Sequence, residues 1–196
     1  MGISLHGVGV ASGIAIGHAH IVSATEQDIP HYKLTTEQIP AELLRFDAAI
    51  RSARKELEQL WDSIPENAPA ELGAFLSLHI MMLNDHTLSK DPRAIIETEA
   101  CNAEWALKIQ RDSLVQVFDS MDDPYLRTRK DDVDHVVRRI QRILLTEDPA
   151  YLNDPSYTDL VASRLEGRIV VADDLTPADT ILMQHQGVLA FVTEYG

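Results

Sequence analysis

The most regular hydrophobic pattern of this chain lies in its middle, between about residues 35 and 145. Apolar residues recur there at alternating spacings of three and four, which places them on one face of a helix. The first stripe consists of Leu43, Phe46, Ile50, Ala53, Leu57, Leu60 and Ile64. It predicts a long amphipathic helix that Thr35 or Thr36 caps and that ends before the proline-bounded break at residues 65–69.

Three more helices are predicted after this break. The helix over residues 70–83 is apolar on most sides, another is predicted over 102–121, and the helix over 124–145 repeats the apolar stripe. Amphipathic helices joined by short breaks favour an antiparallel arrangement. The middle of the chain is therefore predicted to form an antiparallel four-helix bundle.

The two ends of the chain follow a different pattern. Residues 2–24 combine small and β-branched residues with glycines at positions 7, 9, 13 and 17, which is typical of short strands. Residues 168–193 predict strand, helix, strand, and the helix begins at Thr176 with Asp179 in its first turn. Neither end has enough strands for a stable sheet, so we expect them to pair with each other.

The predicted fold class is therefore α/β plus all-α. Residues 1–24 and 147–196 are expected to form one discontinuous α/β domain, and residues 25–146 are expected to form the helical domain inserted in it. The terminal strand-helix-strand unit breaks off at Gly196, at the carboxyl end of a strand where ligands usually bind in such units. We therefore expect the sequence to be a fragment that lacks its catalytic loop.

Composition narrows the choice of partners and compartment. The net charge of −14 disfavours nucleic acid and anionic membranes and suits a basic protein surface. The single cysteine, Cys101, cannot form an internal disulfide, and the N-terminus lacks a basic n-region and an unbroken apolar span. These features predict a cytoplasmic protein.

The residues alone indicate little catalytic chemistry. The N-terminal glycines match neither a dinucleotide-binding nor a P-loop motif. His18 and His20 share a strand face without a nearby carboxylate or thiol, which leaves an incomplete metal site. His79 lies in the most apolar helix, where a histidine is more often a satisfied core residue than a functional one. No metal site and no cofactor are predicted for this chain.

The helix over residues 70–83 has more apolar surface than one seam of a bundle requires. Its apolar side chains are predicted either to be wholly buried or to form an exposed protein-binding patch with a polar rim. The patch residues are Phe75, Met81, Met82 and Leu88, and the rim residues are Glu71, Asp85 and His86.

Four segments, in this order, resemble a known family. They are residues 13–17, 75–83, 123–127 together with 132–134, and 171–180. As a set they closely resemble enzyme I of the bacterial phosphoenolpyruvate:sugar phosphotransferase system, the phosphoenolpyruvate–protein phosphotransferases, over essentially the whole chain. The resemblance implies a swivelling phosphohistidine-type α/β domain with an inserted helical bundle, as the N-terminal half of a longer enzyme.

In this family, phosphoenolpyruvate phosphorylates a histidine with the help of a Mg²⁺-dependent C-terminal domain. The histidine then passes the phosphoryl group to the carrier protein HPr for sugar uptake. The resemblance implies that this histidine lies beyond Gly196 and that none of the eight histidines present is catalytic. The chain by itself is therefore expected to be inactive and monomeric, with phosphoenolpyruvate and Mg²⁺ bound only by the full-length protein.

The resemblance also implies which positions bind HPr. They are Glu71, Ala74, Phe75, His79, Met81, Met82, Leu83, Asp85, His86, Leu88, Phe118 and Arg129. An apolar centre with acidic neighbours suits a partner that presents basic residues around an apolar patch.

Two alternatives remain open at the level of sequence. One is the phosphohistidine domain of an enzyme like pyruvate phosphate dikinase or phosphoenolpyruvate synthase, although those enzymes carry an ATP-grasp domain in place of the bundle. The other is a non-catalytic helical-bundle protein that only binds partners. Within the enzyme I family, the sequence is compatible with sugar uptake and with a regulatory branch that uses a paralogous carrier.

Overall fold

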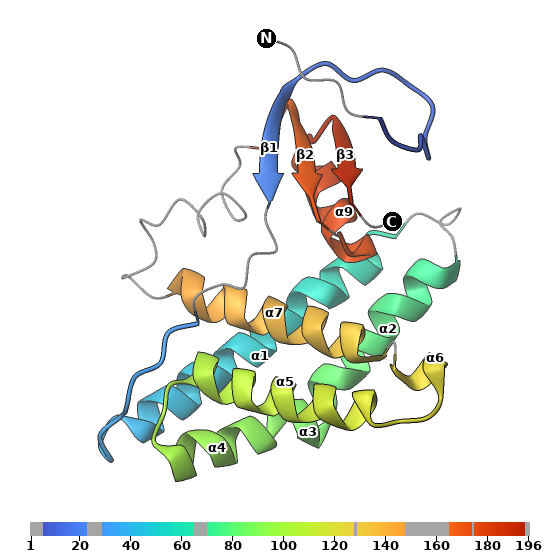
Figure 1. The fold of residues 1–196 in the computed structure, drawn as a ribbon. Coiled ribbons are helices and arrows are strands. Elements are labelled where there is room, and N and C mark those ends of the chain that lie inside the picture. The colour runs from blue at the N-terminus through green and yellow to red at the C-terminus, as the bar shows by residue number, and fades with distance from the viewer. Residues whose placement is uncertain are drawn as a thin grey trace.

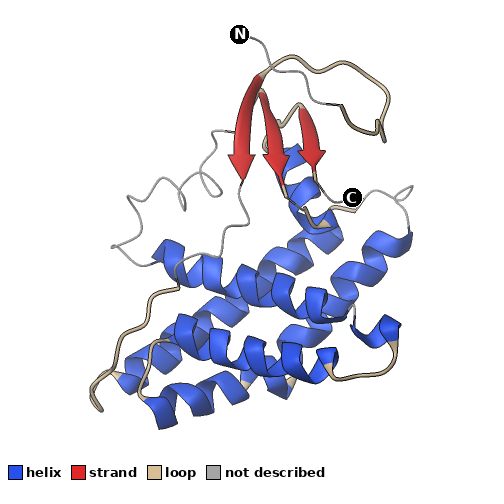
Figure 2. Cartoon of the chain, viewed as in Figure 1, coloured by secondary structure: helices blue, strands red, loops and turns tan. Residues whose placement is uncertain are grey.

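The computed structural model describes residues 6–22, 29–64, 70–127, 129–147, 165–173 and 175–194. The break predicted at residues 65–69 and the domain boundary predicted near residue 24 lie outside these ranges. A mostly helical part lies next to a small sheet with one helix (Figure 1). All three strands of this sheet belong to the two ends of the chain, whereas the described middle consists of helices joined by loops (Figure 2).

The helical part contains most of the described secondary structure. Its elements are α1 (Ile39–Asp62), α2 (Ala70–Asn84), α3 (His86–Ser89), α4 (Asp91–Glu99), α5 (Ala103–Asp119), α6 (Pro124–Arg127) and α7 (Arg129–Glu147). The four predicted helices correspond to α1, α2, α5 and α6 with α7. The sequence analysis missed α3 and α4, because a nine-residue helix with two buried residues, Pro92 and Ile96, shows no readable periodicity.

The predicted cap of α1 is wrong. The N-cap residue is Gln38, without a side-chain hydrogen bond to the helix, rather than Thr35 or Thr36. Pro40 stands in the first turn of α1, and a proline there removes one of the backbone N–H groups that would otherwise need a cap. The Gln38 side chain instead accepts a hydrogen bond from the Thr35 N–H at 2.8 Å.

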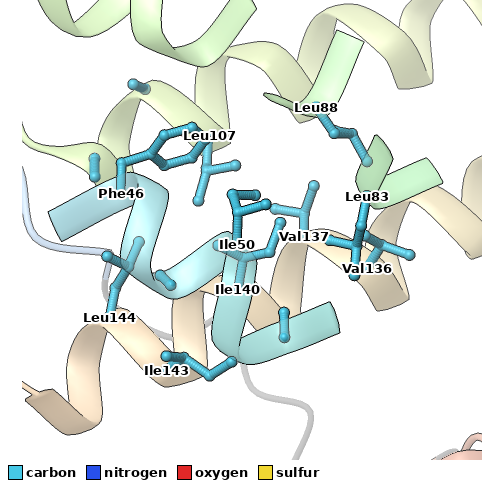
Figure 3. Close-up of a cluster of buried hydrophobic side chains, with 14 of the residues drawn as sticks. Phe46, Ile50, Leu83, Leu88, Leu107, Val136, Val137, Ile140, Ile143 and Leu144 are labelled. Atoms are coloured by element: carbon cyan, nitrogen blue, oxygen red, sulfur yellow. The ribbon is translucent and has the colours of Figure 1, made fainter. Parts of the chain in front are cut away.

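One hydrophobic core joins the helices of this part. The stripe of α1 packs against α5 and α7, while α2 and α3 add residues from the side (Figure 3). The labelled core residues are Phe46, Ile50, Leu83, Leu88, Leu107, Val136, Val137, Ile140, Ile143 and Leu144. The core therefore uses the apolar stripes predicted for α1 and α7 and binds α2 through only part of its surface.

The small sheet unites the two ends of the chain. Strands β1 (His18–Val22), β2 (Arg168–Ala172) and β3 (Ala190–Thr193) are parallel and lie in the order β1-β2-β3. The expected pairing of the chain ends is thus confirmed, with Ala19 opposite Ile169. Gly17 precedes β1, and a Cβ at this position would lie 2.8 Å from the Gly167 carbonyl oxygen, so the close approach of the strands requires glycine here.

Helix α9 (Pro177–His185) connects β2 to β3 and attaches the sheet to the helical part. It begins with the predicted cap: the Thr176 hydroxyl accepts a hydrogen bond from the Asp179 N–H, and the Asp179 carboxylate accepts one from the Thr176 N–H. The guanidinium of Arg139 on α7 donates to Asp179 at 3.5 Å and to Glu56 on α1 at 3.2 Å. Ile181 of α9 also packs against the main core.

Among the described helices, none combines the length and the apolar character that a segment needs to traverse a lipid bilayer.

A buried polar network fixes the chain where it enters the helical part. Asn102 is fully buried, donates hydrogen bonds to the Pro30 carbonyl and the Glu104 carboxylate, and accepts one from the Tyr32 N–H. Burial raises the pKa of Glu104, and its ion pair with Arg45 opposes that rise. The network holds the segment before α1 against the start of α5.

Replacing Asn102 by alanine should therefore destabilise the protein. The substitution removes three hydrogen bonds and leaves a buried carboxylate with one donor fewer, so we expect the free energy of unfolding to fall by about 2–3 kcal/mol. Urea denaturation followed by circular dichroism measures this change. The matched control is Asn84→Ala, because Asn84 is exposed and its side chain bonds the Ile80 carbonyl of its own helix. Equal losses in both variants would contradict the structural role assigned to Asn102.

Candidate functional site

The residues predicted to bind a partner differ in how far they reach the surface. The exposed ones are Glu71, Ala74, Met81, Asp85 and His86. The partly buried ones are Phe75, Met82, Phe118 and Arg129. The buried ones are His79, Leu83 and Leu88.

Helix α2 supplies most of this surface. Only Leu76, His79 and Leu83 of its fifteen residues are buried, and they lie three or four positions apart on the side that faces the core. The remaining apolar side chains are exposed or half-buried, and Met81 keeps 66% of its surface accessible. The alternative of a wholly buried central helix is therefore wrong.

Leu83 and Leu88 point into the hydrophobic core (Figure 3). Neither exposes more than 1% of its surface. Leu83 belongs to the buried stripe of α2, and Leu88 follows on α3, which packs back onto the core. Both side chains are therefore part of the core in this conformation and expose almost no surface.

Charged groups border the apolar surface of α2. Glu71 lies in its first turn, and Asp85 follows its last residue, where the Asp85 side chain caps α3 by accepting from the Thr87 N–H. Hydrogen bonds from Thr87 lower the pKa of Asp85, so this carboxylate is ionised at neutral pH. Arg129 donates to the Asp132 carboxylate at 2.8 Å and also bonds the Tyr125 hydroxyl.

His79 lies beneath this surface and is almost completely buried, with 1% of its area accessible. Its ring packs on Phe75 with a centroid distance of 4.0 Å, and its Nε2 lies 3.7 Å from the nearer Asp132 oxygen. Burial lowers the pKa of His79 to about 4, although Asp132 acts to raise it. His79 is thus a neutral core histidine at pH 7. The expectation that it would be satisfied was wrong, because its Nε2 has no hydrogen-bond partner in the described structure.

The other residues singled out in the sequence offer no further site. His18 is exposed and His20 half-buried on β1, and neither belongs to a three-residue group of potential metal ligands within the described ranges. The side chain of His185 lies outside what the structure describes. Cys101 is buried, and burial raises the pKa of its thiol, which disfavours the reactive thiolate.

Fold and surface together define a two-part domain in which a helical part with an accessible apolar helix is inserted between the strands of a parallel sheet. The chain belongs to the family of PEP-utilising enzymes, because the N-terminal model of this family matches residues 6–129.

Relatives and solved structures agree with this assignment. The chain is 40% identical to a phosphoenolpyruvate-protein phosphotransferase of Cupriavidus necator, over 100% of this chain and 33% of that protein. It is 35% identical to the protein of that name from Bacillus subtilis, over 98% and 32%. The chain thus spans about a third of the length of the curated relatives it matches.

The similar structures are N-terminal domains of Enzyme I proteins. A solution structure of an Enzyme I protein matches with a TM-score of 0.68 and 27% identity, over 95% of this chain and 71% of that one. The N-terminal domain of an "Enzyme 1 - Nitrogen" matches with a TM-score of 0.66 and 26% identity, over 95% and 72%. The mostly helical fold with a small parallel sheet is therefore that of these domains.

Acid should destabilise the protein through His79. The pKa is about 4 in the folded chain and 6.5 for a free histidine, so the unfolded chain binds more protons between these pH values. The contribution of His79 to the free energy of unfolding is fully present above pH 6.5 and is lost as the pH falls. We expect a loss of about 2–3 kcal/mol between pH 7 and 4.5. Asp132, His135 and Arg139, all on α7, are the charged or titratable groups that act on His79.

The measurement is urea unfolding at pH 7, 5.5 and 4.5. The variant His79→Phe should show a shallower decline in stability with acid than the unsubstituted chain, because it keeps a ring but lacks the titrating group. The matched control is His86→Phe, at an exposed position, which should leave the decline unchanged. An unchanged decline in His79→Phe would show that the acid sensitivity has another source.

Proposed function

We propose that this chain is the N-terminal part of a phosphoenolpyruvate–protein phosphotransferase. In the whole protein, a histidine takes the phosphoryl group of phosphoenolpyruvate and passes it to the carrier HPr for sugar uptake in the cytoplasm. The observation that carries this proposal is that relatives of this name match along 98–100% of the chain and in the same fold. The covalent step suits a neutral imidazole, which is the nucleophilic form of histidine.

The proposed division of labour follows the two parts of the structure. Residues 1–24 and 147–196 belong to a swivelling phosphohistidine-type α/β domain, and residues 25–146 form an antiparallel four-helix bundle that docks HPr. The pairing of β1 with β2 and the shared core of α1, α2, α5 and α7 support this division. The accepting histidine belongs to the segment after β3 in the longer protein, and Mg²⁺ and phosphoenolpyruvate belong to its C-terminal domain.

The accessible side of α2 is the proposed docking surface. Methionines suit a surface that must adapt to a partner, and the exposed Met81 and half-buried Met82 lie in the last turn of α2, which also contributes the half-buried Phe75. Glu71 and Asp85 at the two ends of α2 give this surface a negative rim, which favours a partner with basic residues around an apolar patch. Ala74, His86, Phe118 and Arg129 complete the proposed contacts.

The burial of His79, Leu83 and Leu88 reduces the number of residues that can contact a partner directly. Partners usually bind without large backbone changes, so side chains that expose no surface hold the docking residues in place from beneath. We therefore propose that these three act by positioning α2, and that the accessible residues make the direct contacts.

A regulatory branch is the second candidate. The N-terminal domain of an "Enzyme 1 - Nitrogen" matches with a TM-score of 0.66, and the other Enzyme I structure matches with a TM-score of 0.68. Because the two scores are nearly equal, structural similarity supports the regulatory branch about as well as it supports the family in general. Titration of the chain with HPr and, separately, with a paralogous carrier decides between the two, since the true partner binds more tightly.

The docking surface predicts a charge-sensitive hot spot at Met81. The variant Met81→Asp places a charge on the accessible apolar surface of α2, where burial against the partner penalises it, so we expect HPr affinity to fall at least about tenfold. The readout is a titration of the isotope-labelled 196-residue chain with unlabelled HPr, followed by amide chemical shifts. Shifts should cluster on residues 71–86 and around Arg129.

The matched control for this experiment is Leu44→Asp. Leu44 lies on α1 and is 68% exposed, so it equals Met81 in accessibility but lies outside the proposed surface. The control should bind HPr with unchanged affinity. Equal losses in both variants, or no shifts at high HPr concentration with a folded chain, would remove docking on α2 from the proposal.

A further inference from the structure

Three potential metal ligands meet at the seam between α2 and α7. His79 comes from α2, and Asp132 and His135 come from α7, where their spacing of three places them on one face of the helix. One ligand atom from each of the three residues lies within 4.8 Å of the other two. The sequence analysis missed this group, because His79 lies more than fifty positions before the other two residues and meets them only when the two helices pack.

The ring nitrogens of this cluster are unusual for buried polar atoms. Nε2 of His79 and Nδ1 of His135 are both buried and have no hydrogen-bond partner in the described structure. Buried polar atoms almost always find a partner, since leaving one unpaired costs free energy. Two such nitrogens beside one carboxylate indicate that something absent from the polypeptide itself satisfies them.

We propose that the imidazole nitrogens of His79 and His135 and a carboxylate oxygen of Asp132 bind a divalent transition-metal ion, with Zn²⁺ as the best match. Two histidines and a carboxylate form a nitrogen and oxygen ligand set that Zn²⁺ readily accepts, and water takes the fourth, tetrahedral position. The pairing of a carboxylate and a histidine three positions apart on one helix is also the spacing by which helical bundles build metal centres.

The distances allow this site after a small contraction. Ligand bonds of 2.0–2.1 Å place tetrahedral ligand atoms about 3.3 Å apart. His79 Nε2 and the nearer Asp132 oxygen are already only 3.7 Å apart. The other pairs of ligand atoms lie no more than 4.8 Å apart, so they must approach by at most about 1.5 Å to reach tetrahedral spacing. Asp132 and His135 are partly exposed, which leaves their side chains room for this movement.

Neighbouring side chains orient two of the proposed ligands. Arg129 binds Oδ2 of Asp132 at 2.8 Å, which orients the carboxylate and leaves Oδ1 directed at His79. Phe75 packs on the His79 ring and fixes its position. The nearby positive charge of Arg139 would oppose a cation, but Glu56 and Asp179 already pair with it. An ion enters from the surface on the side of Asp132 and His135.

Zn²⁺ binding by these three residues does not require that the chain is part of a phosphotransferase or that it docks HPr, although His79 also lies beneath the proposed docking surface. Its test is a calorimetric titration of the 196-residue chain with Zn²⁺ after treatment with a chelator. We expect saturable binding of one Zn²⁺ per chain, and at least a tenfold weaker affinity in Asp132→Asn and in His135→Ala. Both substituted side chains are partly exposed, so the variants should fold, and circular dichroism in the presence of chelator verifies this.

The controls separate this site from other histidines. His86→Ala and His20→Ala, at positions outside the cluster, should bind Zn²⁺ within twofold of the unsubstituted chain. Co²⁺ gives a second readout, because a tetrahedral site produces visible absorption that Asp132→Asn and His135→Ala should lose. Absence of saturable binding would overturn the proposal. So would unchanged affinity in both cluster variants, or loss of binding in His20→Ala.

Discussion

The ionic contacts of one buried arginine hold the two parts of this structure together. Arg139 exposes only 7% of its surface and reaches Glu56 on α1 and Asp179 on α9. Burial lowers the pKa of its guanidinium, and the two carboxylates offset that cost. A buried charge is tolerated only where partners are correctly placed, so the contacts fix α9 against the helical part. Because Asp179 also caps α9, the same carboxylate sets where the helix begins and which way it points.

The incompletely buried helix of this chain and its cluster of polar side chains both lie at the seam between α2 and α7. Helix α2 buries too few of its apolar residues to be a plain core helix, and Nε2 of the histidine that it does bury has no hydrogen-bond partner among the described residues. Helix α7 contributes Asp132 and His135 to the same place and Arg139 to the junction with α9. A partner on the accessible side of α2 would therefore lie directly above the polar cluster and one helix away from the sheet.

Periodicity in the sequence predicted the long helices and the pairing of the chain ends, because each stripe or strand has a repeat that a single sequence reveals. Periodicity did not predict helices α3 and α4, because they are too short to show an apolar stripe. The predicted threonine cap of α1 was also wrong, since α1 begins with Pro40 in its first turn. For the candidate site, the sequence identified the apolar excess of α2 but not the burial of Leu83 and Leu88. The burial of Leu88 depends on how α3 packs back onto the core, and the ligand cluster depends on the packing of two distant helices. Local spacing in the sequence predicts neither of these.

The network around Asn102 has a consequence for the order of folding. It holds Pro30, where the chain enters the helical part, while Gln141 of α7 bonds the Glu104 carbonyl near the place where the chain leaves. Strand β1 pairs with β2 across most of the chain, from residue 18 to residue 168, and such distant pairing is slow in an unfolded polymer. Once the helices have packed, Pro30 and Gln141 are both held near the start of α5, which shortens the effective loop that the pairing of β1 with β2 must close. We therefore expect the sheet to assemble after the helices.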